Sequence, residues 1–250
     1  MKINIDPRKS VQENASEYYT KAKKIKKKIE GLEKEIERSK KEIEKEKKKK
    51  PKEKIEKVRK EKKWFESFHW CYSSKGRLII GGKSASQNDV IFKKYTEDSD
   101  LFFHADITGG SVVILKDGVN ASKEEREEAA QFAASYSRAW KLSYATIDVY
   151  CLKKDQLSKH VQGAYVGKGG IAMEGKREWF RSTPLGLRIG IGNDGIEIIS
   201  QNSNRVLKNE KELVPGKIKK EKVASKLSEL FKIHMDEIIH LLPPGEIAIK

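Results

Sequence analysis

His104 and Asp106 are the side chains in this sequence that most resemble an acid–base couple. They lie two positions apart in an apolar run, so on a strand both would share one face. With Lys159 they would supply the residue types of a metal-dependent nuclease. The sequence offers no metal-ligand spacing and no nucleophile triad, however. We therefore favour a structural or nucleic-acid-contacting role for His104 and expect no enzyme activity, no cofactor and no metal.

Lys83 stands directly after Gly81 and Gly82, where an apolar run ends and a short helix is expected over residues 84–94. Glycines let a phosphate approach the backbone closely, and a helix start favours anions. The pattern is not a P-loop, so it does not predict nucleotide hydrolysis. It predicts either a phosphate contact by Lys83 or a tight turn with a solvated lysine.

Arg138 and Lys141 flank Trp140 at the end of a predicted amphipathic helix, residues 123–140. Trp140 falls on the apolar stripe of this helix and is expected to anchor the core. The two cations fall off the stripe. They are candidates for contacts to a nucleic-acid backbone, or they interact favourably with the carboxyl end of the helix.

A glycine-rich segment, residues 159–170, combines the cations Lys159 and Lys168 with the aromatic Tyr165. Such a loop can follow a sugar-phosphate chain while the aromatic ring stacks on an exposed base. The alternative is a flexible hairpin with a buried tyrosine. Lys176 and Arg177 add a second basic pair beyond the loop.

Most of the positive charge sits in the first quarter of the chain. The whole sequence holds 53 Lys and Arg against 37 Asp and Glu, a formal charge of +16. Residues 1–63 carry 25 of these cations and 13 of the anions, whereas residues 64–250 are nearly balanced. A run of four lysines is a candidate contact to ribosomal RNA, although charge runs are usually solvated faces. These residues are Lys47, Lys48, Lys49 and Lys50.

Residues 8–63 are predicted to be a helical arm, which begins at an Asp6–Pro7 cap. Its apolar positions repeat at alternating spacings of four and three, as in a coiled coil. They are Tyr18, Ala22, Ile25, Ile29, Leu32, Ile36, Ser39 and Ile43. We expect an antiparallel hairpin with its tip near Pro51, or near Arg38–Ser39 if the two arms have equal length. Dimerisation of one helix with a second copy is the alternative.

Residues 64–200 change character and read as a β-rich domain with one main helix. Trp64 and Trp70 are expected to form the hydrophobic joint with the arm, and Trp179 to pack in the core. Residues 201–250 are predicted to be a small helical extension, with helices over residues 219–231 and 234–242. The fold class is therefore α+β. Short apolar runs predict strands at Leu78–Ile80, Leu101–Phe103, Val112–Leu115, Ile147–Leu152 and Gly170–Met173.

Cys71 and Cys151 lie far apart with no CxxC pattern or Cys/His cluster nearby, so neither a disulfide framework nor a zinc site is expected. The first ten residues lack the apolar core of a signal peptide, and no stretch approaches 18 apolar residues. The expected location is cytoplasmic, without membrane contact.

Several segments in this order form a recognisable pattern: Ser10–Ala15 with Tyr18-Tyr19, Trp64–Trp70, Ser73–Lys83, Ala85–Asn88, Phe103–Asp106 with Gly110-Ser111, Tyr136–Trp140, Lys159–Lys176 and Leu241–Gly245. The upstream segment resembles the start of the middle coiled coil of the NFACT family. The segments from Trp64 onward resemble its RNA-binding (R) domain, and the Leu-Leu-Pro-Pro-Gly ending is similar to archaeal members. This family includes the ribosome quality-control factors known as NEMF in animals and fibronectin-binding-protein-A-like proteins in microbes.

The resemblance implies an arm over residues 1–63, an RNA-binding domain over 64–200 and an extension over 201–250. It implies a non-catalytic component of ribosome-associated quality control that binds tRNA or rRNA on the large ribosomal subunit after stalling. The alternative is a stand-alone nucleic-acid-binding module. The family's N-terminal domain, which is tied to C-terminal tailing, has no counterpart in this sequence. The sequence is therefore expected to be a separately encoded half, an excised fragment or a diverged stand-alone module, and in the first case an N-terminal half is a candidate partner.

Overall fold

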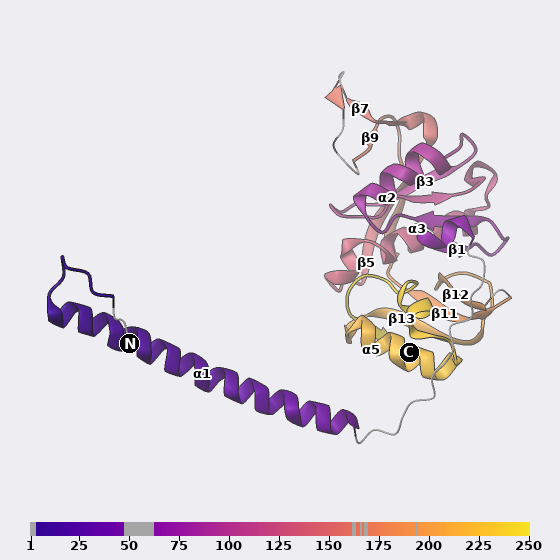
Figure 1. Ribbon diagram of the computed structural model, residues 1–250. Helices are drawn as coiled ribbons and strands as arrows, with labels where there is room; N and C mark the ends of the chain where they lie inside the picture. Colours follow the sequence, from indigo (N-terminus) through magenta and orange to yellow (C-terminus); the bar gives the residue numbers. More distant parts are fainter. Residues whose placement is uncertain (1–3, 48–62, 162–163, 166, 168–169, 194) are drawn as a thin grey trace. The chain divides into compact units, whose positions relative to one another are not determined.

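The computed structural model describes residues 4–47, 63–161, 164, 165, 167, 170–193 and 195–250 (Figure 1). The chain divides into two compact units, residues 1–54 and residues 55–250.

The first unit is built on one long helix, α1 (Val11–Lys47). Its expected start at Asp6–Pro7 is wrong, because Ser10 caps the helix instead. The Ser10 N–H donates to Glu13 Oε2 at 2.7 Å, and the Glu13 N–H donates back to Ser10 Oγ at 3.2 Å. This reciprocal pairing satisfies two backbone donors that would otherwise be unpaired. The Asn14 amide then ties the preceding residues to the helix, since it bonds the backbone of Asp6 in both directions.

The apolar stripe of α1 is exposed within the described part of the chain. Ile25 is 59% exposed and Leu32 is 56% exposed. The helix runs unbroken through Arg38 and Ser39, so a hairpin tip at that point is wrong. Pro51 and the expected second arm lie outside the described residues. The coiled-coil pairing therefore stays a prediction.

The second unit contains a six-stranded sheet in which every neighbouring pair is antiparallel. The strands predicted from the apolar runs near residues 78, 101, 112 and 147 are confirmed, whereas β10 was not expected. The order across the sheet is β1 (His69–Tyr72), β2 (Leu78–Gly81), β4 (Val113–Leu115), β3 (Leu101–Ala105), β5 (Thr146–Lys153) and β10 (Glu178–Pro184).

Helix α3 (Lys123–Ser135) covers one face of this sheet. The expected stripe of Ala129, Phe132, Ala133, Tyr136 and Trp140 is buried throughout. The helix is shorter than predicted, however, and Trp140 belongs to a separate turn, α4 (Arg138–Lys141). The cause is Ser137, whose Oγ donates to the Ala134 carbonyl at 2.7 Å and accepts from the Ala139 N–H at 3.1 Å. A serine side chain that bonds the backbone in this way competes with the helix ladder.

The opposite face of the sheet is covered by short helical turns. These are η1 (Trp64–Ser67), α2 (Ala85–Val90) and the π-helical turn η2 (Ile91–Tyr95). Trp64 stacks on Tyr95 with ring centroids 4.3 Å apart, and Phe65 packs edge-on against Trp70 at 5.0 Å. Both tryptophans thus pack against aromatic rings of the second unit, and their expected joint with the arm stays a prediction.

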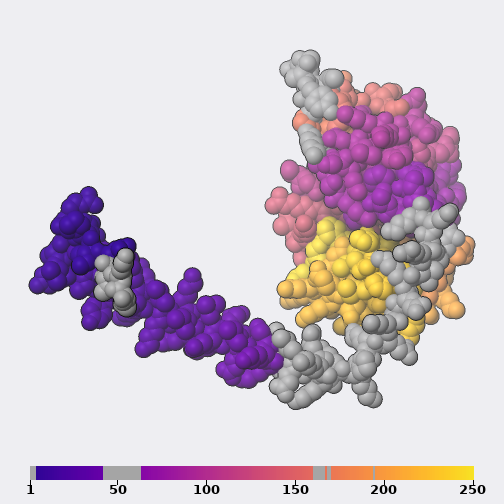
Figure 2. All heavy atoms as spheres, in the orientation of Figure 1, coloured from indigo at the N-terminus to yellow at the C-terminus, as the bar shows by residue number. Residues whose placement is uncertain are grey.

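A second, four-stranded sheet joins residues on both sides of position 200. Its order is β12 (Gly195–Ser200), β11 (Leu187–Gly192), β13 (Lys208–Ile218) and β14 (Ile247–Ile249). The expected helices appear as α5 (Lys220–Phe231) and α6 (Met235–Ile239). A purely helical C-terminal extension is therefore wrong, because β13 and β14 complete a sheet that begins before residue 200. Figure 2 shows the C-terminal residues, in yellow, continuous with the surface of the first sheet. Whether residues 201–250 act as a functional unit stays a prediction.

Two small hairpins complete the fold. Strand β6 (Leu157–Ser158) pairs with β9 (Ala172–Met173), and β7 (His160–Val161) pairs with β8 (Ala164–Tyr165). The strand expected at Gly170–Met173 is confirmed in its last two residues only. Figure 1 shows β7 at the end of the second unit opposite α5.

The turn between β1 and β2 is tied to α3 by a buried ion pair. Glu125 is fully buried and accepts from Ser73 Oγ at 2.7 Å and from Arg77 Nη1 at 2.8 Å. It also accepts from the Ser122 N–H at the start of α3. Removing Glu125 would leave the Ser73 hydroxyl and the Ser122 N–H without their acceptor, while Arg77 would keep only Asp117 as an anionic partner among the described residues.

We predict that Glu125→Ala lowers the free energy of unfolding of the second unit by about 3 kcal/mol. Glu127→Ala is the control, because Glu127 is 45% exposed and should change stability by less than about 0.5 kcal/mol. Urea unfolding followed by tryptophan fluorescence measures this unit alone, since all four tryptophans lie between residues 64 and 179. Equal losses in the two variants would contradict the role given to Glu125.

His69 is stacked on Tyr136 at 4.0 Å between the first sheet and α3. Burial, and then the charges of Lys83 and Lys220, hold the pKa of His69 well below its ordinary value of 6.5. The imidazole of His69 therefore takes up a proton near pH 6.5 in the unfolded chain but stays neutral at that pH in the folded chain. Folding stability should fall as the pH drops below that value.

We predict that His69→Phe, which keeps a ring against Tyr136, makes the stability less dependent on pH below 6.5. Thermal unfolding of the two proteins near pH 7 and near pH 5 measures the difference, because other titrating groups are common to both. Parallel losses of stability would show that His69 is not held neutral.

Candidate nucleic-acid interface

Four chain segments meet at one end of the six-stranded sheet because neighbouring strands run in opposite directions. His69 opens β1 and pairs with Gly81 at the close of β2, which in turn pairs with Val113 of β4. Strand β3 closes at Ala105 on the same end. Lys83 and the loop over residues 106–111 must therefore leave the sheet side by side.

Lys83 lies on a tightly built turn, as expected from its glycines. A Cβ on Gly82 would lie 2.0 Å from Asn88 Oδ1, so no other residue fits there without displacing Asn88. The Ser111 hydroxyl donates to the Gly82 carbonyl at 2.7 Å. The Lys83 N–H donates to Gln87 Oε1 at 2.9 Å, and Ser84 caps α2. The strand-to-helix turn at Lys83 is thus confirmed, whereas its phosphate contact stays a prediction.

Arg138 and Lys141 lie at the same end of the sheet on α4. Gly109, in the loop after β3, lies against the aliphatic part of Arg138, since a Cβ there would be 3.7 Å from Arg138 Cβ. Both cations are exposed. Within the described part of the chain, neither side chain forms a hydrogen bond or an ion pair. Their positive charges therefore face solvent.

Lys220 joins these cations, although the sequence did not single it out. It is partly buried at the start of α5 and donates to the Leu242 carbonyl at 2.9 Å. Burial and the neighbouring Lys141 lower the pKa of Lys220, while Glu221 acts in the opposite sense. We call Lys83, Arg138, Lys141 and Lys220 the sheet-end cluster. Neighbouring cations make each other's charged form less stable, and a bound anion would offset this repulsion.

His104 lies on the outer face of β3, beneath the loop after that strand. A Cβ on Gly110 would lie 2.9 Å from the imidazole ring, so the glycine allows this close approach. The Tyr150 hydroxyl and His104 Nδ1 are 3.2 Å apart. Burial lowers the pKa of His104, and bonds to the backbone of Ala105 and Gly110 only partly offset this effect. A neutral, covered imidazole supports the structural interpretation, while direct RNA contact by His104 stays a prediction.

Lys159 is engaged within the protein. Its ammonium group pairs with Asp89 and donates to the Gly170 carbonyl, and its side chain is only 9% exposed. Lys159 thus ties the segment between β6 and β7 to α2. Among the described residues, no group of three histidine, cysteine, aspartate or glutamate side chains is arranged to hold a metal ion.

Some predicted contacts fall where the structure gives no description. Lys168 and the lysines at 48–50 lie outside the described residues, as do the side chains of Lys47 and Tyr165. Lys176 and Arg177 are described and exposed at the start of β10. The role of all these residues in RNA binding stays a prediction.

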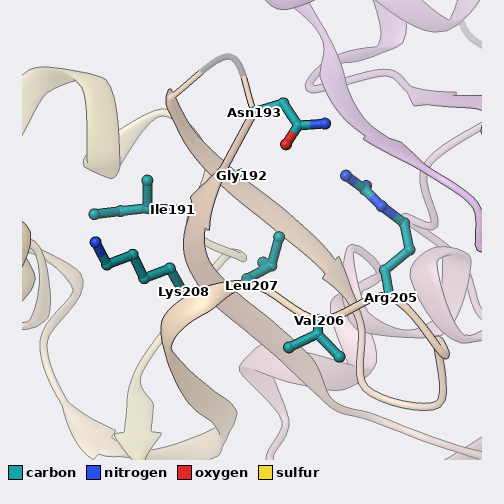
Figure 3. A pocket seen from close by; sticks show the side chains of 7 residues that line it. All are labelled: Ile191, Gly192, Asn193, Arg205, Val206, Leu207 and Lys208. Atoms are coloured by element: carbon teal, nitrogen blue, oxygen red, sulfur yellow. The ribbon is translucent and has the colours of Figure 1, made fainter.

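A surface pocket lies between the β11–β12 turn and residues 205–208 (Figure 3). Arg205 and Asn193 extend from its wall, but the guanidinium of Arg205 is already bonded to Glu197 at 2.6 Å and to the Tyr72 carbonyl at 3.3 Å. The pocket therefore offers few unpaired polar groups to a ligand. As for membranes, none of the helices in the described part of the chain combines the length and apolar character that a crossing requires.

Comparison with known proteins finds relatives for both parts of the chain. Residues 67–175 match the profile of the NFACT protein RNA binding domain, and residues 1–63 match that of the NFACT N-terminal and middle domains. The archaeal Rqc2 homolog aRqcH of Methanocaldococcus jannaschii is 42% identical over 203 residues, which cover 77% of this chain and 30% of that protein. The ribosome quality control complex subunit NEMF homolog of Drosophila melanogaster is 36% identical over 131 residues, 51% of this chain and 13% of that protein.

A solved structure, the C-terminal part of the fibronectin/fibrinogen-binding protein from Streptococcus suis, is 25% identical and covers 69% of this chain and 76% of that one, with a TM-score of 0.41. The chain spans less than a third of the length of the archaeal relative. The resemblance of the sequence is thereby confirmed: the chain belongs to the NFACT family and carries its RNA-binding domain.

Proposed function

We propose that this protein is a non-catalytic, RNA-binding component of ribosome-associated quality control. It binds tRNA or rRNA on the large ribosomal subunit after translation has stalled. The names of its relatives, which are ribosome quality control factors, support this assignment together with the RNA-binding domain. A cytoplasmic location follows from the same proposal.

The observation that carries the proposal is the sheet-end cluster. Two of its cations, Arg138 and Lys141, have no anionic partner within the described residues, and Lys220 is already destabilised as a cation by burial. A phosphate is the ligand that relieves this repulsion, and the RNA backbone supplies phosphates at regular spacing. The turn at Lys83 is rigid, so binding there costs little conformational entropy.

The same geometry favours binding over catalysis. The imidazole of His104 meets Tyr150 and is covered by Gly110, and Lys159 is paired with Asp89. Two of the three residues that suggested a nuclease, His104 and Lys159, are thus engaged with other groups. The basic arm then adds sequence-independent attraction to RNA, with the Lys47–Lys50 run as its proposed rRNA contact.

We predict that Lys83→Glu or Arg138→Glu weakens binding to tRNA or to ribosomes by about tenfold or more, because each replaces a phosphate-binding cation by a repelling carboxylate. Gel-shift titration at moderate salt measures the loss, and circular dichroism checks that both variants remain folded. Lys226→Glu is the matched control, an exposed lysine on α5 outside the cluster. Wild-type affinity in both cluster variants would remove the cluster from the proposal.

We also predict that the protein co-sediments with large ribosomal subunits at moderate salt and binds them more tightly than free duplex DNA. Shape recognition of structured RNA provides this preference, since A-form RNA and B-form DNA present different grooves. Equal affinity for duplex DNA would support a stand-alone nucleic-acid-binding module instead.

A further inference from the structure

At strand β10, on the edge of the six-stranded sheet, two arginines lie over aromatic rings: Arg177 directly before the strand and Arg181 within it. The Arg177 guanidinium is centred 4.6 Å from the ring of Tyr150, and the Arg181 guanidinium lies 4.0 Å from the ring of Trp179. Trp179 is the register partner of Tyr150, and their rings meet edge to face at 5.4 Å. We call Tyr150, Arg177, Trp179 and Arg181 the arginine–aromatic ladder.

The local backbone and Asp148 hold Arg181 in the ladder. The pairing of β10 with β5 shifts between Phe180 and Thr183, and Ser182 adopts a positive φ of 49°. An irregularity of this kind redirects side chains, and such bulges are frequent at functional sheet edges. The Ser182 N–H donates to Asp148 at 2.8 Å, and Arg181 Nη1 donates to the same carboxylate at 2.6 Å. Arg181 is therefore held in place while its side chain remains 63% exposed.

Arg177 is held by the rings alone. It is exposed, it lies within 6.0 Å of the Trp179 ring as well as over Tyr150, and no carboxylate in the described part of the chain pairs with it. Stacking on an aromatic face fixes the guanidinium plane, so less conformational entropy is lost when a ligand binds. Arg177 thus leaves its N–H edge open to solvent, whereas Arg181, whose Nη1 is bonded to Asp148, offers its remaining N–H groups.

This arrangement distinguishes nucleotides from simpler anions. A carboxylate uses only the N–H edge of a guanidinium, whereas a nucleotide can place its base on the outer face and its phosphate at the edge. Paired bases have their faces covered by neighbours, so the ladder fits bases that are unpaired. We propose that the arginine–aromatic ladder is a stacking site for unpaired nucleotides of RNA, separate from the phosphate contacts of the sheet-end cluster. The proposal rests on the RNA-binding function inferred above.

The test uses the full chain and two labelled probes of about 12 units, an oligoadenylate and a ribose-phosphate chain of equal length without bases. The wild type should bind the oligoadenylate more tightly than the chain without bases. The double variant Arg177→Gln, Arg181→Gln should lose about fivefold or more of its affinity for oligoadenylate and little of its affinity for the other probe. Lys222→Gln, Lys226→Gln removes the same charge from α5 and should affect both probes equally.

The single variant Arg177→Lys refines the test, because it keeps the charge but loses the planar group. It should retain the salt dependence of oligoadenylate binding and still lose affinity. A double ladder variant that binds oligoadenylate like the wild type, while Lys83→Glu still fails to bind tRNA, overturns the ladder and leaves the proposed function intact. Unchanged RNA affinity with loss of ribosome binding would assign the ladder to a protein partner and also overturn it. A wild type that binds neither probe nor tRNA would overturn both proposals.

Discussion

Helix α3 lies between the two sheets of the second unit, and the polar groups on its buried side need partners inside the protein. Glu125 meets Ser73 and Arg77 from the first sheet. Further along, the Glu128 carbonyl accepts from Ser200 Oγ at 2.7 Å, and the Gln131 amide oxygen accepts from the Asn202 N–H at 2.8 Å. These bonds fix the position of α3 against both sheets.

The same constraint continues past the end of α3 and positions the proposed binding surface. Ser135 exchanges hydrogen bonds with the backbone of Gly186, the Tyr136 hydroxyl donates to the Leu241 carbonyl, and Trp140 Nε1 donates to the Glu246 carbonyl at 3.0 Å. The C-terminal segment is thereby held against α4, which brings Lys220 close to Lys141. The cations of the sheet-end cluster come from segments that are distant in the sequence. The packing of α3 and α4 brings them together.

The elements found from sequence are those whose burial leaves a clear pattern. The apolar runs predicted strands β2, β3, β4 and β5. The apolar stripe that ends at Trp140 predicted the helical segment that forms α3 and α4. Strands β10 and β13 were not predicted because both are partly exposed and lack the alternation of a half-buried strand, and β13 is also rich in charged residues. The helix break at Ser137 depends on side-chain bonds that periodicity does not register.

Candidate site residues divide in the same way. Lys83 and Arg138 were found because glycines and a helix end surround them, and the structure brings them to one end of the sheet. Lys220 lay in an ordinary basic stretch and gains significance only through tertiary packing. Arg181 was not singled out from the sequence, and Trp179 was assigned to packing alone, although both lie in the ladder.

The central claim is that structured RNA lies across the sheet-end cluster. Ultraviolet crosslinking of the full chain to ribosome-bound RNA, with the crosslinked peptides identified by mass spectrometry, tests it most directly. The account predicts crosslinks in the peptides that contain Lys83 and residues 138–141. Crosslinks restricted to the helical arm, with none in the second unit, would contradict it.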